Sequence, residues 1–308
     1  MALIICTKDR PFHMENLIKV LLKQILLPQM IVVVDSSSND LTFRLSNESS
    51  LNLITNLIYI KSSPGLPKQR NIGIDIVNRN LGLDELRIVS FVDDDIDLDP
   101  DYFFNLSSDL DDLDDLDDFV AITGLNHSVR NRKVNVFHRL FLLTSKIPGR
   151  VLSSGQVSQP YSNEGVAKTD WIPGLSMNIC PKVLKREKFD ETIRMYGEDL
   201  EFSLRLNRQG KLYCSHNLNY RHYAASEGRE DVIKVTAFTD GILWKLAGQY
   251  PQQIQRKAII WSVLGLVLLD LLKLSTLRGH RARVQRILGH LIFISRITLG
   301  KNPAQENV

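Results

Sequence analysis

FVDDDIDLDPD, residues 91 to 101, carries the chain from an apolar run directly into a series of acidic side chains. The run Arg87–Val92 predicts a strand, after which the chain releases Asp93, Asp94 and Asp95 into a loop. Three adjacent carboxylates repel one another, so burying them is costly unless a cation is bound. Hard oxygen ligands suit Mg²⁺ or Mn²⁺, and such an ion can hold a substrate diphosphate. The alternative interpretation is an ordinary polar strand end, because the short acidic pattern alone is weakly specific.

The segments before this stretch define its surroundings. Apolar runs rich in isoleucine and valine alternate with helical patterns, which predicts a parallel, doubly wound α/β sheet. The predicted strands cover Ala2–Cys6, Met30–Val34 and Leu57–Ile60, and predicted helices begin at Pro11 and cover Lys68–Asn78. Ligands of such sheets bind beyond the carboxyl ends of the strands. That rule selects Thr7, Asp35 and the acids at 93–95 as candidate ligand contacts.

A second acidic group lies in MYGEDLEFSLRLNRQG, residues 195 to 210. Its leucine spacing predicts a helix with Glu198 and Asp199 near the beginning, where the helix dipole favours negative charge. The pair is either an ordinary acidic first turn or the site of a general base acting on a hydroxyl nucleophile. His222 has two interpretations as well, a structural histidine or a third Mn²⁺ ligand beside the carboxylates.

Two other classes of site are excluded by spacing. An EF-hand counted from Asp93 would place Leu98 at the glycine position and Phe104 at the position of the bidentate glutamate. The sequence contains no GxxxxGK[ST] motif, so P-loop phosphoryl transfer has no support. Nucleic-acid binding is not expected either, because the basic segments lack interleaved aromatic residues or a known motif.

The cysteines and the N-terminus indicate a compartment. Three cysteines lie far apart without CxxC spacing, which predicts neither a zinc site nor a disulfide framework and favours a reducing environment. The apolar start is five residues long and is followed at once by Lys8, Asp9 and Arg10, so no signal peptide is expected. We therefore expect the catalytic part to face the cytoplasm.

Charge is distributed unevenly along the 308 residues. Residues 251–308 hold nine Lys and Arg but two acids, a net charge of +7, whereas the chain as a whole has +3 and residues 1–250 therefore about −4. This contrast predicts an α/β domain over residues 1–250 and a basic helical tail over residues 251–308. A basic, apolar tail on an acidic body indicates contact with an anionic surface.

The tail contains an apolar segment, AIIWSVLGLVLLDLLKL at 258–274, and a second helical pattern after Arg278-Gly279-His280. A spanning helix needs about 20 apolar residues, and Asp270 interrupts this shorter segment. Three interpretations stay open: a helix pair lying in the plane of an anionic membrane surface, helices packed on the enzyme or a dimer partner, and a transmembrane span. The first predicts a peripheral protein on the inner face of the plasma membrane.

Several of these segments, taken in order, resemble the family 2 glycosyltransferases of the GT-A fold. The resemblance runs over roughly residues 2 to 223, and each segment by itself is weakly specific. Its segments are LIICTKDRP, VVVDSSSND, GLPKQRNIGI, FVDDDIDLDPDYF, WIPGLSMNICPKVL and FDETIRMYGEDLEFSLRL. It implies a Rossmann-like GT-A domain with a mainly parallel central sheet, and a DxD motif at the acidic stretch.

The resemblance also implies roles on the donor side. Thr7 and Asp35 would contact the nucleobase and ribose, and Arg70 would lie near the phosphates. Asp93 would approach the ribose or the metal, and Asp95 would bind the metal directly. The second segment has Asp-Ser-Ser-Ser where the family often has Asp-Asp-Gly-Ser, so the nucleobase contact depends on Asp35 alone.

The remaining positions complete this predicted site. Asp94 is placed with the donor-binding residues, and His222 stands where some members have a further ligand to Mn²⁺ or Mg²⁺. Asp199 matches the catalytic base, with Glu198 beside it. Trp171 and Gly174 would shape the acceptor and donor-sugar pocket.

The function implied is a metal-dependent inverting hexosyltransferase. It would move a sugar from a nucleoside diphosphate, with UDP the first expectation and dTDP and GDP behind it, to a hydroxyl of a glycan or lipid-linked acceptor. Polysaccharide or glycolipid assembly is the expected setting. The alternatives are a sugar-phosphate nucleotidyltransferase, which would not need Asp199 as a base, and an inactive sugar-nucleotide-binding scaffold.

Overall fold

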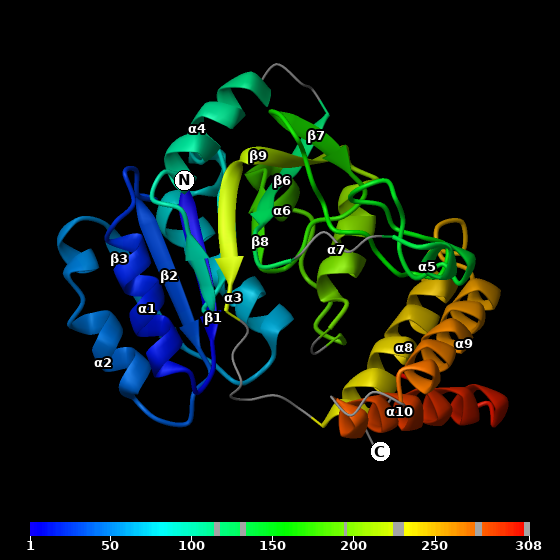
Figure 1. Ribbon diagram of the computed structural model, residues 1–308. Coiled ribbons are helices and arrows are strands. Elements are labelled where there is room, and N and C mark those ends of the chain that lie inside the picture. The colour runs from blue at the N-terminus through cyan, green and yellow to red at the C-terminus, as the bar shows by residue number, and fades with distance from the viewer. Residues whose placement is uncertain (114–117, 130–133, 194–195, 224–230, 275–278, 305–308) are drawn as a thin grey trace. The chain divides into compact units, whose positions relative to one another are not determined.

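The computed structural model describes residues 1–113, 118–129, 134–193, 196–223, 231–274 and 279–304. Its chain forms two units (Figure 1). The sheet unit comprises residues 1–130 and 160–228, and the helical unit comprises residues 131–159 and 229–308. Residues 275–278 and 305–308 of the predicted tail lie outside the described residues.

The sheet unit is built on one mixed sheet with the strand order β3-β2-β1-β4-β8-β6-β9-β5, and β7 pairs with β9. Its strands are β1 (Ala2–Thr7), β2 (Met30–Asp35), β3 (Asn56–Lys61), β4 (Val89–Asp93), β5 (Ile96–Leu98), β6 (Phe119–Asn126), β7 (Val166–Thr169), β8 (Ser176–Ile179) and β9 (Lys211–His222). The strands β3, β2, β1 and β4 are parallel to one another, as predicted, while β8 runs antiparallel to both β4 and β6. The predicted α/β fold class is thus confirmed.

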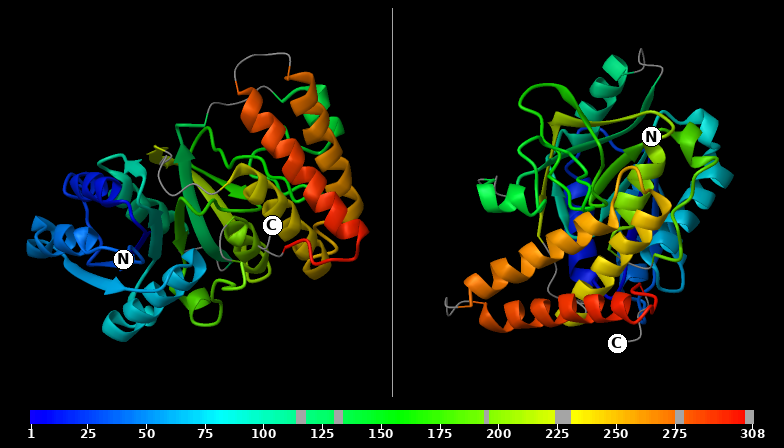
Figure 2. Two further views of the ribbon diagram at one scale, coloured as in Figure 1. Left: turned by 90° about the horizontal axis from the view of Figure 1, so that it is seen from below. Right: turned by 90° about the vertical axis from the view of Figure 1, so that its right-hand side faces the viewer.

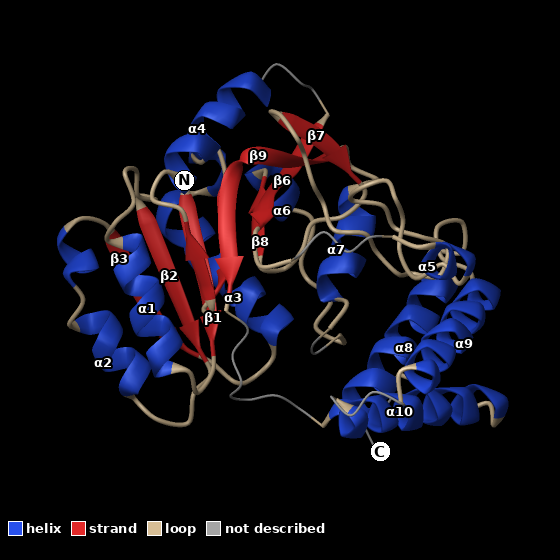
Figure 3. Cartoon of the chain, viewed as in Figure 1, coloured by secondary structure: helices blue, strands red, loops and turns tan. Residues whose placement is uncertain are grey.

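Helices cover the sheet because its strands are apolar on both faces (Figure 3). On β1, alternate residues enter two different cores, one with Ile4 and the other with Leu3 and Ile5. The helices of this unit are α1 (Pro11–Leu21), α2 (Leu41–Asn47), α3 (Leu66–Leu81), α4 (Tyr102–Leu113), α6 (Pro181–Leu184) and α7 (Glu198–Leu206), with short 3₁₀ turns at Ser50–Leu53 and Leu83–Glu85. Side chains of α3 and α7 join the Ile4 core, and those of α1 and α4 join the other. The result is a helix–sheet–helix sandwich.

The helical unit contains α5 (Val136–Leu140), α8 (Val232–Gln249), α9 (Arg256–Leu272) and α10 (His280–Thr298). Three of these are long helices, α8, α9 and α10, which pack on one another (Figure 2). Gly289 allows α10 to approach α8, because a Cβ there would lie 2.6 Å from Thr236 Cβ and 2.7 Å from the Ile233 carbonyl. None of the helices in the described part of the chain has the length and apolar character needed to cross a membrane.

This division differs from the boundary that we placed at residue 250. Helix α8 groups with the tail because it packs against α10 and α9. The segment 131–159 also belongs to the helical unit, although it comes before the end of the sheet unit in sequence. One of its contacts is the stacking of Phe141 on Trp261 of α9, with ring centroids 4.8 Å apart.

Candidate functional site

The candidate site lies at the carboxyl ends of β1, β2 and β4 in the sheet unit. Thr7 is in register with Asp35 on the neighbouring strand, and Cys6 is in register with Asp93. The next strand, β8, begins directly after Gly174 and Leu175, and the Asp93 amide donates to the Leu175 carbonyl at 3.3 Å. Parallel order therefore brings the polar strand ends together at one edge, as the topology requires.

Each of the three consecutive aspartates has a cationic partner, and Asp94 and Asp95 share Arg10. Asp93 Oδ1 lies 3.4 Å from Arg70 Nη2. Asp94 accepts hydrogen bonds from Thr7 Oγ1 at 2.7 Å and from Arg10 Nη1 at 3.0 Å. Asp95 Oδ1 lies 3.3 Å from His222 Nε2, and its Oδ2 lies 3.6 Å from Arg10 Nη1. These cationic and hydrogen-bonding partners explain how the acidic run is accommodated with Asp94 and Asp95 buried.

The buried environment of this cluster disfavours its negative charge. Burial raises the pKa of Asp93 to about 6. Arg70 acts in the opposite direction, and the neighbouring Asp95 and Asp94 raise this pKa further. Burial also raises the pKa of Asp94, although hydrogen bonds from Thr7 and Arg10 act in the other direction. The hydrogen bond to Asp95 raises the pKa of His222. An added cation would relieve this excess of negative charge.

Part of the cluster suits a divalent cation. Two ligand atoms at right angles on bonds of about 2.1 Å lie about 3 Å apart, close to the separation of Asp95 Oδ1 and His222 Nε2. Within the described residues, no three His, Cys, Asp or Glu side chains converge to form a metal site. The predicted set of Asp93, Asp95 and His222 is therefore not gathered around one point, because Asp93 faces Arg70. Ions such as Mg²⁺ are commonly held by one or two carboxylates together with substrate phosphates, which fits a two-residue protein site.

Arg70 connects the acidic cluster to the acidic helix. Helix α3 carries it into the interior, where its side chain is 2% exposed. Its guanidinium donates to Glu198 Oε1 at 3.1 Å and to the Gly174 carbonyl at 3.0 Å, besides its contact with Asp93. The guanidinium carbon also lies 5.2 Å from the centroid of the Phe189 ring. A buried cation with this many partners fixes the segments that it joins.

Glu198 and Asp199 begin α7, as predicted, but occupy different environments. Glu198 is buried against Arg70, and burial raises its pKa to about 7, with the neighbouring Asp199 adding to the effect. Asp199 is half-buried, its Oδ2 accepts from the Gly174 amide at 3.0 Å, and its Oδ1 accepts from the Leu200 amide at 2.8 Å. Of the two carboxylates, Asp199 is thus the one that solvent can reach, and two backbone amides orient it.

Gly174 is a close-packed position between these groups. A Cβ there would lie 2.9 Å from Arg70 Nη2 and 3.4 Å from Glu198 Oε1. Trp171, three residues earlier, is 5% exposed, and its carbonyl accepts from Thr169 Oγ1 at 2.9 Å. The contribution of Trp171 and Gly174 to a sugar pocket stays a prediction.

The predicted nucleobase residue, Asp35, is fully buried at the end of β2. The Ser37 amide donates to its Oδ1 at 2.8 Å, and the Tyr59 hydroxyl donates to its Oδ2 at 2.7 Å. Tyr59 and Arg10 are two residues at this edge that no pattern in the sequence indicates as site residues. Arg10 lies in the quoted segment LIICTKDRP, but nothing local in the sequence links it to an aspartate 84 residues away.

Comparison with known proteins places the fold. No protein-family model matches the sequence, and no curated protein sequence gives a significant match. S. aureus TarS 1-349 in complex with UDP is 16% identical and aligns over 97% of this chain and 91% of that chain, with a TM-score of 0.51. The same protein in complex with UDP-GlcNAc gives 15% identity, coverage of 97% and 92%, and a TM-score of 0.52. The mannosyltransferase PcManGT from Pyrobaculum calidifontis in complex with GDP-Man and Mn²⁺ gives 15% identity, coverage of 95% and 86%, and a TM-score of 0.58.

These similarities confirm the predicted fold. The chain has the GT-A fold found in family 2 glycosyltransferases. At 15 to 16% identity the similarity concerns the fold, and the activity has to be argued from the site.

Proposed function

We propose that this chain is a glycosyltransferase that moves a sugar from a nucleoside diphosphate to an acceptor hydroxyl with inversion. One observation carries the proposal. A half-buried carboxylate, Asp199, is held by the Gly174 backbone, and the same glycine accepts from Arg70, which contacts Asp93. A prospective base is thereby fixed relative to the acidic cluster that would receive the diphosphate, and such fixed geometry is what positions reactants for transfer.

The chain's own residues supply the proton chemistry. Asp199 would accept the proton of the acceptor hydroxyl as that oxygen attacks the anomeric carbon. Arg70 holds Glu198 and Asp93 in place, so that the carboxylate beside the base is neutralised by a buried cation. Asp95 and His222 would hold a divalent cation, which would neutralise charge on the departing diphosphate.

Inversion follows from a single displacement. The acceptor oxygen approaches from the side of Asp199, and the diphosphate leaves from the opposite face of the sugar. Glycoside hydrolases instead use two carboxylates that flank the bond, one of them protonating the leaving oxygen. A nucleoside diphosphate is a good leaving group, so its departure does not need such an acid. This supports Asp199 as base and Glu198 as a buried ion-pair partner that positions it.

The donor and the acceptor belong to the proposal as well. The fold neighbours are complexes with UDP, UDP-GlcNAc and GDP-Man, so sugar nucleotides as a class fit this architecture. We propose a UDP-sugar as donor and a hydroxyl of a growing polysaccharide or a glycolipid as acceptor. A nucleotidyltransferase would release pyrophosphate, whereas the proposed reaction releases a nucleoside diphosphate, so identifying the released product separates the two activities.

Calorimetric titration tests the donor site. UDP, dTDP and GDP are titrated into the wild-type chain and the Asp95→Ala variant, each with Mn²⁺ and with EDTA. We expect one nucleotide to bind in the presence of Mn²⁺, and we expect Asp95→Ala to abolish that binding. Asp75→Ala is the matched control, because Asp75 is an exposed acid on α3 that pairs with Lys188. Failure of all three nucleotides to bind a folded protein would overturn the proposal.

A further inference from the structure

Helix α9 exposes a row of large apolar side chains. The residues that face the interior of the helical unit are the apolar Ile259 and Val263 together with the small or polar Ala258, Ser262, Gly265 and Asp270. The large apolar residues on the exposed side recur at helical spacing: Ile260 (42% exposed), Trp261 (41%), Leu264 (45%), Leu268 (36%), Leu271 (48%) and Leu272 (70%). The outer face of a surface helix is usually polar, so this row departs from the usual arrangement. We call these six residues the α9 stripe.

Contacts on the packed side of α9 fix the rotation of the helix about its own axis. Asp270 accepts two hydrogen bonds from Arg286 of α10, at 2.9 and 2.6 Å. Gly265 lies against the Phe141 ring, where a Cβ would approach within 2.3 Å of Phe141 Cβ. The ion pair of the buried Asp270 and the close contact at Gly265 therefore fix which side faces outward. The stripe is a stable property of this unit, and a large exposed apolar patch marks an interaction site.

Neighbouring segments extend the same kind of surface. The Trp261 indole donates to the Leu140 carbonyl at 2.7 Å, which ties the stripe to the segment around α5. That segment exposes Val136 (79%), Leu140 (60%) and Ile147 (61%). Tryptophan is favoured at the boundary between lipid and water, because its indole has an apolar body and a polar N–H.

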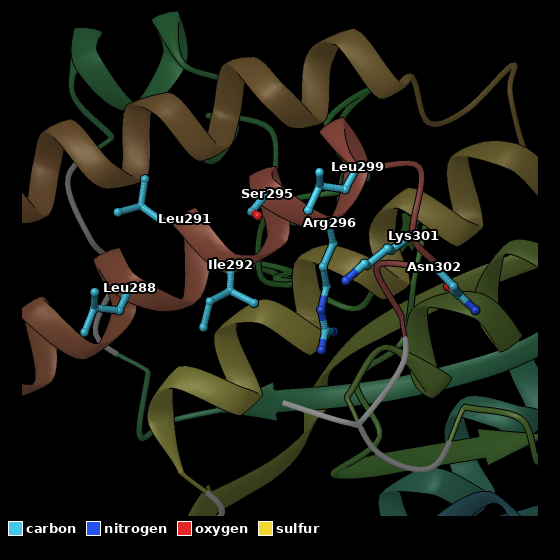
Figure 4. Close-up of a pocket in the computed structure, with 8 residues that line it drawn as sticks. All are labelled: Leu288, Leu291, Ile292, Ser295, Arg296, Leu299, Lys301 and Asn302. Carbon is cyan, nitrogen blue, oxygen red and sulfur yellow. The ribbon is translucent and has the colours of Figure 1, made fainter.

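Helix α10 adds a groove that combines apolar and cationic side chains (Figure 4). Its volume is about 440 Å³. It is lined by Leu288, Leu291, Ile292, Ser295, Arg296, Leu299, Lys301 and Asn302. A groove with leucine walls and two cations suits an amphiphile that carries an anionic head group and a hydrocarbon chain.

The charge of the chain follows the division into units. The helical unit contains 17 Lys and Arg against five Asp and Glu, a net charge of +12, and its segment 131–159 alone contributes five cations and no acid. The sheet unit contains 21 Lys and Arg against 30 Asp and Glu, a net charge of −9. The apolar surface thus belongs to the unit that carries the positive charge, and the candidate active site belongs to the other.

We propose that the helical unit docks on the surface of an anionic phospholipid bilayer through the α9 stripe and the α10 groove. The stripe would lie among the acyl chains near the head groups, and the cations would meet lipid phosphates. A symmetric dimer that joins two helical units fits the surface less well, because two units of charge +12 repel each other. This proposal does not depend on the proposed catalytic activity, because its surface lies entirely in the helical unit.

Vesicle sedimentation tests the proposal with the full chain. Vesicles of phosphatidylcholine alone are compared with vesicles containing about one-third phosphatidylglycerol. We expect the wild-type chain to sediment with the anionic vesicles and to be released by salt. Leu264→Gln/Leu271→Gln should weaken binding at least ten-fold. The matched control is Leu53→Gln/Ile54→Gln in the sheet unit, which replaces two exposed apolar residues (85% and 56%) and should leave binding unchanged.

Two further variants keep the test informative if the leucine variant folds poorly. Arg296→Gln/Lys301→Gln removes two cations from the groove and should weaken binding about ten-fold or more, since each basic residue near the surface contributes about 1 kcal/mol. Trp261→Phe keeps an aromatic ring that can stack on Phe141, but it should abolish the quenching of tryptophan fluorescence by brominated lipid.

Several results would contradict docking on an anionic bilayer. Equal sedimentation with neutral and anionic vesicles, or no sedimentation with either, would overturn the proposal. It also fails if the stripe variant binds as tightly as the wild type, or if light scattering shows a dimer that the stripe substitutions dissociate.

Discussion

At the scale of single residues, the two adjacent acids of α7 are distinguished by environment. Asp199 accepts hydrogen bonds from the amides of Gly174 and Leu200, while Glu198 forms an ion pair with Arg70. We predict that Asp199→Asn lowers kcat by about 10²- to 10⁴-fold, the usual contribution of a general base, while the Kd of the nucleotide stays within about two-fold. Steady-state kinetics and calorimetry check this. A variant with unchanged kcat would remove Asp199 from the mechanism.

Glu198 gives a prediction about pH. Its pKa is raised from an ordinary value of 4.5 to about 7 in the folded chain, so the folded state retains a proton that the unfolded chain releases. Its contribution to stability is therefore greatest at low pH and is lost as the pH rises from about 4.5 to about 7. Glu198→Gln should remove about 2 kcal/mol of this dependence between about pH 5 and 8. Denaturant unfolding of the wild type and of Glu198→Gln, both in EDTA, measures the free energy of unfolding as a function of pH. The same pH dependence in both proteins would contradict the prediction.

At the scale of elements, the close approach of α3 to β1 helps to position Arg70. A Cβ at Gly73 would lie 2.4 Å from Ile4 Cγ2 on β1, and Ile4 is in the core. We predict that Gly73→Ala destabilises the chain by about 1 to 3 kcal/mol and also weakens nucleotide binding, because α3 must move away from β1. Asn80→Ala, on the exposed end of α3, should change neither quantity. Urea unfolding and calorimetry measure the two effects.

Elements also mark the limit of what the sequence analysis could predict. Strand runs such as Ala2–Cys6 and Met30–Val34 were identified within a residue of β1 and β2, because buried parallel strands have a strong apolar signal. Strand ends then placed Thr7, Asp35 and Asp93 together through topology alone. Topology alone does not predict which side chains pair. The contacts of Arg10 with Asp94 and of Tyr59 with Asp35 depend on packing between segments that are far apart in the sequence.

At the scale of the whole molecule, the sequence boundary at residue 250 missed a division that is discontinuous along the chain. Segment 131–159 joins the helical unit through contacts such as the one between Phe141 and Trp261. Composition along a linear sequence cannot reveal such a pairing. The boundary at residue 250 also gave too small a charge difference between the two parts, because residues 131–159 add positive charge to the helical unit and not to the sheet unit.

The separation of site and surface into different units leads to a prediction for the whole chain. All the candidate donor-site residues and Asp199 belong to the sheet unit, whereas the α9 stripe belongs to the helical unit. Leu264→Gln/Leu271→Gln should therefore leave nucleotide Kd and turnover of a water-soluble acceptor within about two-fold, because the substituted residues belong to a different unit from the donor-site residues. The same variant should transfer sugar to a lipid-embedded acceptor at least ten-fold more slowly, because the enzyme no longer concentrates at the vesicle surface. Parallel assays with both acceptors measure this, and an equal loss on the two acceptors would mean that the helical unit contributes to the active site itself.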